Sequence, residues 1–154
     1  MGSVTQDGMA LRKLMLGQKV ERATSNMTTG LELFTVSEGN CLVTLMMGEV
    51  TTLIGSESVD FDIVADPTTG TSTDIAATLA VDADEAGTLY CVNGVAATAL
   101  VAGSSGSVAG PLQPFIVAPG AIEITVTDDG AHTGSVAWTL FYIPLEDGAY
   151  ITAT

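Results

Sequence analysis

Positive charge is nearly absent from this chain of 154 residues, which has four lysines and arginines against 18 aspartates and glutamates and a formal net charge of −14. Every cation lies at or before residue 22, where only Asp7 and Glu21 oppose them: Arg12, Lys13, Lys19 and Arg22. Because binding to phosphate groups requires clustered lysine and arginine, the acidic remainder is not expected to bind nucleic acid or an anionic membrane. The negative net charge instead predicts a cationic partner, or a partner that is contacted through the basic segment.

Long hydrophobic runs are also missing, although apolar residues make up 47% of the chain and charged residues only 14%. Runs such as Val95 to Ala102 are far shorter than the roughly 20 residues of a membrane-spanning helix. In a typical soluble domain about a quarter of the residues are charged, so part of this apolar surplus is expected in subunit interfaces. We therefore predict a soluble homo-oligomer.

Cysteine is scarce, and Cys41 and Cys91 are the two examples. The apolar run Leu14-Met15-Leu16 is too short for the core of an export signal. The chain is therefore expected to fold in a reducing cytoplasm. There the two cysteines are expected to be free, buried thiols rather than a disulfide.

Residues that commonly carry enzyme chemistry are few. The one histidine, His132, lies in a turn, and no serine occupies the G-x-S-x-G elbow of a hydrolase. A closed zinc site needs four histidine or cysteine ligands, which the chain does not supply. Aromatic residues make up 5% of the chain, so a sugar-stacking platform has few candidates. We predict a protein that is not an enzyme and uses no cofactor.

The acidic turns leave the question of a metal ion open. Asp82, Asp84 and Glu85 look like the start of a calcium loop, since hard cations prefer carboxylate oxygens, but the remaining ligand spacing of an EF-hand is missing. A different site between loops would add Asp128 and Asp129 if the fold brought the two turns together. A solvated acidic turn is the alternative, and no metal site is assigned.

From Leu31 onward the sequence has the pattern of β-strands. Val59, Phe61 and Ile63 alternate with Asp60 and Asp62, which gives one apolar and one acidic face. Further strand patterns are bounded by turn residues: 31–36, 41–47, 75–81, 89–92, 115–117, 122–127 and 136–143. About eight to ten short strands of this kind predict an all-β fold, an antiparallel β-sandwich or barrel that is jelly-roll-like.

Two details of these strands are also predicted. Residues 37–40, Ser-Glu-Gly-Asn, have the composition of a tight β-hairpin connection between their neighbours. The strand at 136–143 is apolar on both faces. It is therefore predicted to be central in its sheet, or to be covered on its second face by another subunit.

Residues 1–30 are predicted to form a basic N-terminal arm and linker, and residues 31–154 the body. Leu11, Leu14 and Met15 have the i, i+3, i+4 spacing of one helix face, Gly17 limits that helix to about two turns, and residues 23–30 have the composition of a linker.

The arm is long enough to leave its own subunit. Twenty-two extended residues reach up to about 70 Å, whereas the body has a radius of gyration of about 15 Å. A terminus that is basic by chance is the alternative. The predicted partner-binding set combines apolar and basic residues: Leu11, Arg12, Lys13, Leu14, Met15, Lys19 and Arg22.

Three stretches carry a family resemblance: Leu33 to Ser37, Val43 to Thr52, and Trp138 to Tyr150. With them, residues 30–154 resemble small β-rich virion structural proteins of tailed bacteriophages, of the head decoration or cement type. The resemblance lies in the strands and carries no catalytic residues.

The resemblance implies a capsid decoration protein, usually a homotrimer, that clamps the major capsid protein and stabilises its lattice. It also implies assembly in the host cytoplasm and a place on the surface of the virion. A head-fibre or tail structural protein is the alternative within the same class. A secreted carbohydrate-binding β-sandwich module is the alternative from another class.

Overall fold

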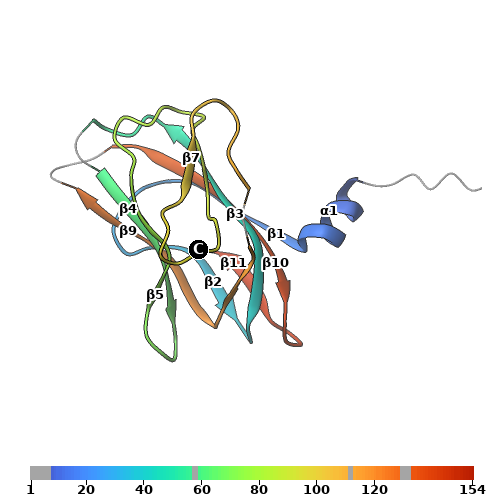
Figure 1. The fold of residues 1–154 in the computed structure, drawn as a ribbon. Helices are drawn as coiled ribbons and strands as arrows, with labels where there is room; N and C mark the ends of the chain where they lie inside the picture. Colours follow the sequence, from blue (N-terminus) through green and yellow to red (C-terminus); the bar gives the residue numbers. More distant parts are fainter. Residues whose placement is uncertain (1–7, 57–58, 111–112, 129–132) are drawn as a thin grey trace, which may run out of the picture.

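The computed structural model describes residues 8–56, 59–110, 113–128 and 133–154. In these residues the chain forms one helix, α1 (Gly8–Leu16), and eleven strands (Figure 1). The strands are β1 (Gln18–Asn26), β2 (Leu31–Ser37), β3 (Cys41–Thr52), β4 (Val59–Pro67), β5 (Thr73–Ala80), β6 (Leu89–Cys91), β7 (Val101–Gly103), β8 (Phe115–Val117), β9 (Gly120–Asp128), β10 (Ser135–Pro144) and β11 (Tyr150–Ala153).

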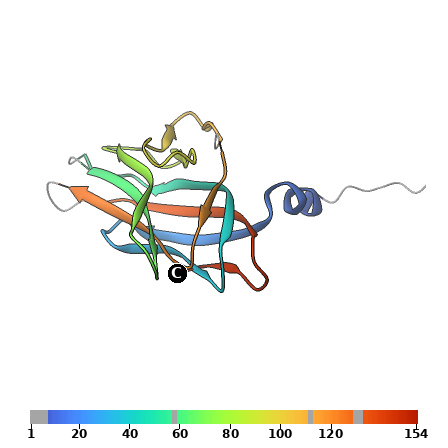
Figure 2. The ribbon, with the colours of Figure 1, turned by 60° about the horizontal axis from the view of Figure 1, so that its bottom comes forward.

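The strands form two antiparallel sheets, which confirms the predicted all-β sandwich. Sheet A has the order β1-β10-β3-β6-β7, and β8 pairs with β3 beside it. Sheet B has the order β11-β2-β9-β4-β5. The helix α1 projects from one side of this sandwich (Figures 1 and 2).

Aromatic side chains from both sheets meet in the core between them. Phe61 of β4 packs edge-on against Tyr90 of β6, with ring centroids 5.3 Å apart, and against Trp138 of β10 at 6.2 Å. All three side chains are buried. The Tyr90 hydroxyl donates a hydrogen bond of 2.7 Å to Asp84, so its polar end is satisfied. Burial and this contact with Asp84 raise the pKa of Tyr90.

The strand predicted to be central lies in the interior of sheet A, because β10 pairs with β1 on one side and β3 on the other. Trp138 and Leu140 point into the core. Phe141 is only 6% exposed but lies outside the main core cluster, and the guanidinium of Arg12 in α1 lies over its ring. The inner face of β10 is therefore buried in the core, while on its outer face Phe141 is buried and Ile143 is 38% exposed.

The predicted hairpin at residues 37–40 is wrong. These residues carry the chain from β2 in sheet B to β3 in sheet A, and the two strands do not pair with each other. Glu38 and Gly39 have φ values of 63° and 153°, and the Asn40 amide donates a 2.8 Å hydrogen bond to Glu146. Turn residues of this kind fit a corner between two sheets as well as a hairpin. The long pairings of β2 with β9 and of β3 with β10 place the two strands in different sheets, so the connection is a corner.

The predicted linker at residues 23–30 is wrong for its first half. Strand β1 runs to Asn26, with Ser25 opposite Val136 and Asn26 opposite Ser135. Without β1, the backbone donors and acceptors on that side of β10 would lack partners, and a polar strand suits the exposed edge of a sheet. Residues 18–26 therefore belong to the sandwich, and the body extends beyond the predicted boundary at residue 31.

The two cysteines are free and buried, as predicted. Cys41 begins β3 and Cys91 ends β6. Burial raises the pKa of both thiols, which keeps them in the protonated, unreactive form.

The contact of Gly48 with the core gives a test of the packing. A Cβ on Gly48 would lie 2.9 Å from Cζ3 of Trp138 and 3.0 Å from Cγ1 of Val136. We expect Gly48→Ala to lower the free energy of unfolding by about 1–3 kcal/mol, the usual cost of overpacking, as measured by chemical denaturation. Gly110→Ala is the matched control, because a Cβ there meets no atom within 4 Å. Equal stability of the two variants would contradict this packing.

Candidate partner-binding surface

The C-terminal end of α1 is fixed to sheet A. Gly17 follows the helix with φ 87°, and its N–H donates a 3.0 Å hydrogen bond to the carbonyl of Lys13. The Thr44 hydroxyl donates a 2.6 Å hydrogen bond to the carbonyl of Leu16. A Cβ on Gly17 would lie 2.1 Å from the Tyr142 carbonyl oxygen, so only glycine allows this close approach. The helix is therefore held at one end while the rest of it projects.

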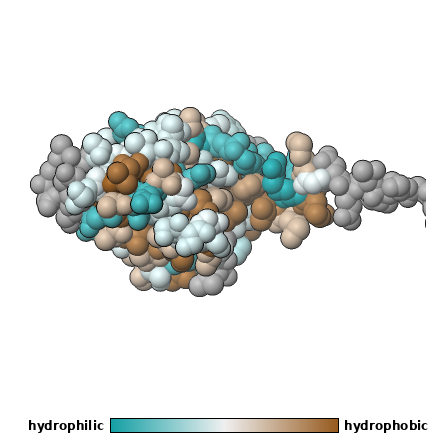
Figure 3. Space-filling model, turned by 90° about the horizontal axis from the view of Figure 1, so that it is seen from above, coloured by the Kyte–Doolittle hydropathy of each residue, from teal (hydrophilic) through white to brown (hydrophobic). Residues whose placement is uncertain are grey.

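One face of α1 is apolar and exposed. Leu11, Leu14 and Met15 share that face by their spacing, and their exposed fractions are 43%, 81% and 69%. The structure thus brings these three predicted residues together. Figure 3 shows hydrophobic residues of the projecting helix in brown, beside hydrophilic residues in teal. Exposed apolar side chains grouped in this way are typical of a surface that binds a partner.

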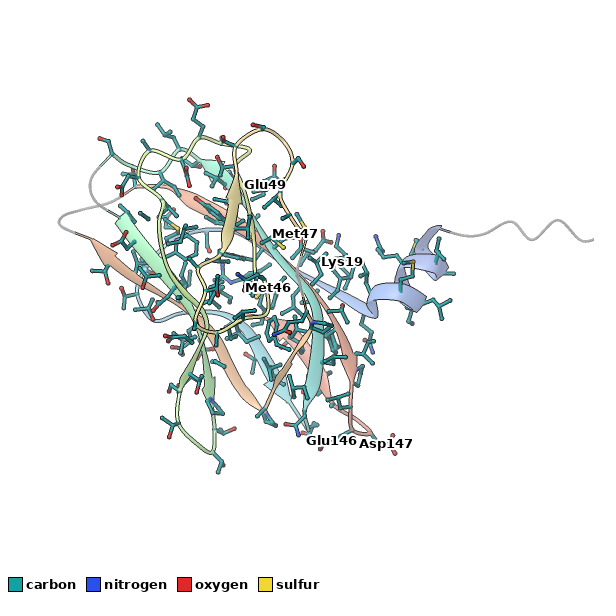
Figure 4. All side chains as sticks on the ribbon, viewed as in Figure 1. Lys19, Met46, Met47, Glu49, Glu146 and Asp147 are labelled. Atoms are coloured by element: carbon teal, nitrogen blue, oxygen red, sulfur yellow. The ribbon has the colours of Figure 1, made fainter. Side chains whose placement is uncertain are left out.

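Basic residues lie on a different side of α1. The Arg12 guanidinium is 5.9 Å from the ring centroid of Phe141, within the range of a cation–π contact. Arg12 and Lys13 line a hollow of about 270 Å³ between α1 and the start of β1, to which Lys19 contributes the third cation. Lys19 also pairs with Glu21 on the same face of β1. Figure 4 shows Lys19 at the start of β1, beside the helix.

Arg22 does not join this surface. It is opposite Trp138 in the register of β1 and β10 and is half-buried, on the strand face opposite to Lys19 and Glu21. Burial lowers the pKa of Arg22, its terminal nitrogen donates to the Ser25 hydroxyl, and its Nε atom has no hydrogen-bond partner among the described residues. Arg22 is therefore less accessible than the other six residues of the predicted set, all of which are exposed.

A shallow groove of about 450 Å³ crosses the outer face of sheet A, and the sequence did not predict it. Consecutive residues of three neighbouring strands line it: 21–23 of β1, 137–139 of β10 and 47–49 of β3. The short side chains of Ala23 and Ala137 lie between longer ones such as Met47 and Glu49, which Figure 4 labels on β3. These strands are far apart in the sequence, so only their register reveals the groove.

The outer face of sheet B is strongly acidic. Glu32 of β2 lies opposite Glu123 of β9, and Asp62 of β4 lies opposite Thr125 in the same sheet. Burial raises the pKa of Asp62, with a smaller contribution from Asp74. Burial also raises the pKa of Glu123, and the charges of Asp66 and Glu32 add to the effect. No lysine or arginine follows Arg22 in the sequence, so this face has no cation of its own.

The acidic turns are engaged with the protein itself. The Asp82 carboxylate accepts a hydrogen bond from the N–H of Val59, and Asp84 accepts one from Tyr90. Within the described residues, no three histidine, cysteine or acidic side chains are grouped so as to hold a metal ion. Asp129, His132 and the side chain of Asp128 lie outside the described part, so the loop site that included the two aspartates stays a prediction.

In the described residues, no helix is long and apolar enough to span a membrane. Comparison of the chain with protein-family models, with curated proteins and with solved structures found no match.

The acidic face of sheet B predicts a specific pH dependence. An acid whose pKa is raised by folding binds its proton more tightly in the folded chain, so stability rises as pH falls through that raised pKa. We expect the melting temperature to increase as pH falls from 7 toward the ordinary values of 3.8 for Asp62 and 4.5 for Glu123. At pH 7, Asp62→Asn with Glu123→Gln should raise the melting temperature by a few degrees and flatten the pH profile.

Asp147→Asn is the control for this measurement, because Asp147 lies exposed in the loop between β10 and β11. It should leave the pH profile as it is in the parent chain. A melting temperature that falls steadily between pH 7 and pH 5 would contradict the expected sign.

Proposed function

We propose that this chain is a structural virion protein, a capsid decoration or cement protein of a tailed bacteriophage. The observation that carries the proposal is α1, whose apolar face is exposed while its C-terminal end is held on the β-sandwich. Leu14 is 81% exposed in the described chain, a costly position for leucine unless another molecule covers it.

The partner that we propose is the major capsid protein. The body supplies a rigid sandwich with a packed core, and α1 supplies a short amphipathic element that can lie in an apolar groove of the lattice. An isolated helix of nine residues is marginally stable, so α1 gains most from a surface that completes its packing. In this proposal the protein acts as an oligomer that links neighbouring capsid subunits after assembly in the host cytoplasm.

Binding to capsids tests the proposal directly. We expect Leu11→Ala with Leu14→Ala and Met15→Ala to weaken binding to capsids of the phage by more than about tenfold, because these side chains supply the apolar contact. Cosedimentation of the purified chain with capsids that lack it measures the effect. Folding should be unaffected, since all three side chains are exposed and alanine favours helix.

Leu53→Ala is the matched control, because Leu53 is an exposed leucine, at 54%, outside the helix. A chain that begins at Gly17 removes α1 but keeps β1, and it should remain folded without binding capsids. If that shortened chain decorates capsids as fully as the parent, α1 is not the attachment element. If immunogold particles label the tail of the phage instead of its head, the protein is a tail component and not a capsid decoration protein.

A further inference from the structure

The hollow between α1 and β1 is cationic, and the described acids near it do not neutralise all of its positive charges. It is lined by Arg12, Lys13 and Lys19 together with three uncharged residues, Met9, Gly17 and Gln18. Glu21 pairs with Lys19, and among the described residues no acid lines the hollow itself. Three of the four cations of a chain with net charge −14 thus converge on one small surface.

The geometry of this hollow is fixed before any partner arrives. The hydrogen bonds of Gly17 and of Thr44 hold the end of the helix, and Arg12 rests on the ring of Phe141. Strand β1 holds Lys19 through its pairing with β10. The backbone that carries the three cations is therefore already in place when an anionic group binds, which favours affinity.

The complementary surface is present on the same chain but on its other sheet. The outer face of sheet B has exposed carboxylates on β2, β4 and β5, at Glu32, Asp66 and Asp74, and no cation. The helix α1 packs on β1 and β10, both of which belong to sheet A. Two copies of this chain repel each other through their net negative charge. A contact that places these cations against carboxylates of the other copy avoids that repulsion.

We propose that the cationic hollow between α1 and β1 binds carboxylates on the outer face of sheet B of a second copy of this chain. The proposal specifies how copies contact one another in the homo-oligomer of the proposed function. It rests on the proposed function only in requiring that oligomer. The two surfaces are different, so the contact is head-to-tail and closes into a ring or extends into a filament. The basic side of α1 then joins copies to one another, while its apolar side stays available for the capsid.

Sedimentation of the purified full-length chain without capsids tests the proposal. We expect wild-type chains to associate at low salt, and association to weaken as salt screens the charges. Arg12→Gln with Lys13→Gln should weaken association at least about tenfold. Ser105→Glu with Ser107→Glu is the control, because it produces the same change in net charge on an exposed loop. It should associate like the wild type.

Charge exchange identifies the receiving face. Chains with Arg12→Glu and Lys13→Glu, and chains with Glu32→Lys and Asp74→Lys, should each fail to associate when pure. The mixture should associate, because the unchanged hollow of the second variant meets the unchanged acidic face of the first, and the reversed charges of the two variants also attract each other. A wild type that is monomeric throughout, or a glutamine variant that associates like the wild type, would overturn the proposal. A mixture that stays monomeric would overturn the assignment to sheet B. None of these results depends on capsid binding.

Discussion

The backbone pairing of β1 with β10 determines where the N-terminal residues of this protein lie. Val20 is opposite Leu140 and Gln18 is opposite Tyr142, so Gly17 arrives directly against the Tyr142 carbonyl. A helix that followed a free linker could occupy many positions. Here α1 is joined through Gly17 to β1, a strand that is already part of a sheet. The hydroxyl of Thr44 holds the last turn of the helix. The C-terminal end of the projecting helix is therefore anchored to the sandwich.

Two backbone periodicities then sort the side chains of this segment into separate surfaces. The two-residue period of β1 directs Lys19 outward and turns Arg22 toward the sandwich, which is why charge alone overestimated the basic surface. The helical period separates Leu11 and Leu14 from Arg12. A segment that the sequence presents as one basic arm consequently has an apolar face and a cationic face, and the two proposals use one face each.

Much of the fold was predictable, because alternation over a strand is a local signal. The pattern around Phe61 and the apolar faces of β10 each identified a strand, and the central place of β10 between β1 and β3 fits the second. The connection at Glu38 and the role of Ser25 were not predictable, since turn residues fit either a hairpin or a corner, and polar residues fit either a linker or an edge strand. The groove across β1, β10 and β3 depends on register, which no single segment contains.

The charges of sheet B and of the segment that contains α1 and the start of β1 are unbalanced in opposite directions. On the outer face of sheet B, burial and the neighbouring carboxylates make ionisation of Asp62 and Glu123 unfavourable, and the chain has no cation there to offset it. Folding alone therefore leaves an acidic surface that a cationic partner would stabilise. The same chain confines its freely exposed cations to α1 and the start of β1, on the other sheet. A surface that cannot be neutralised within one copy, together with the matching charges on a different face, favours association between copies over a solitary subunit.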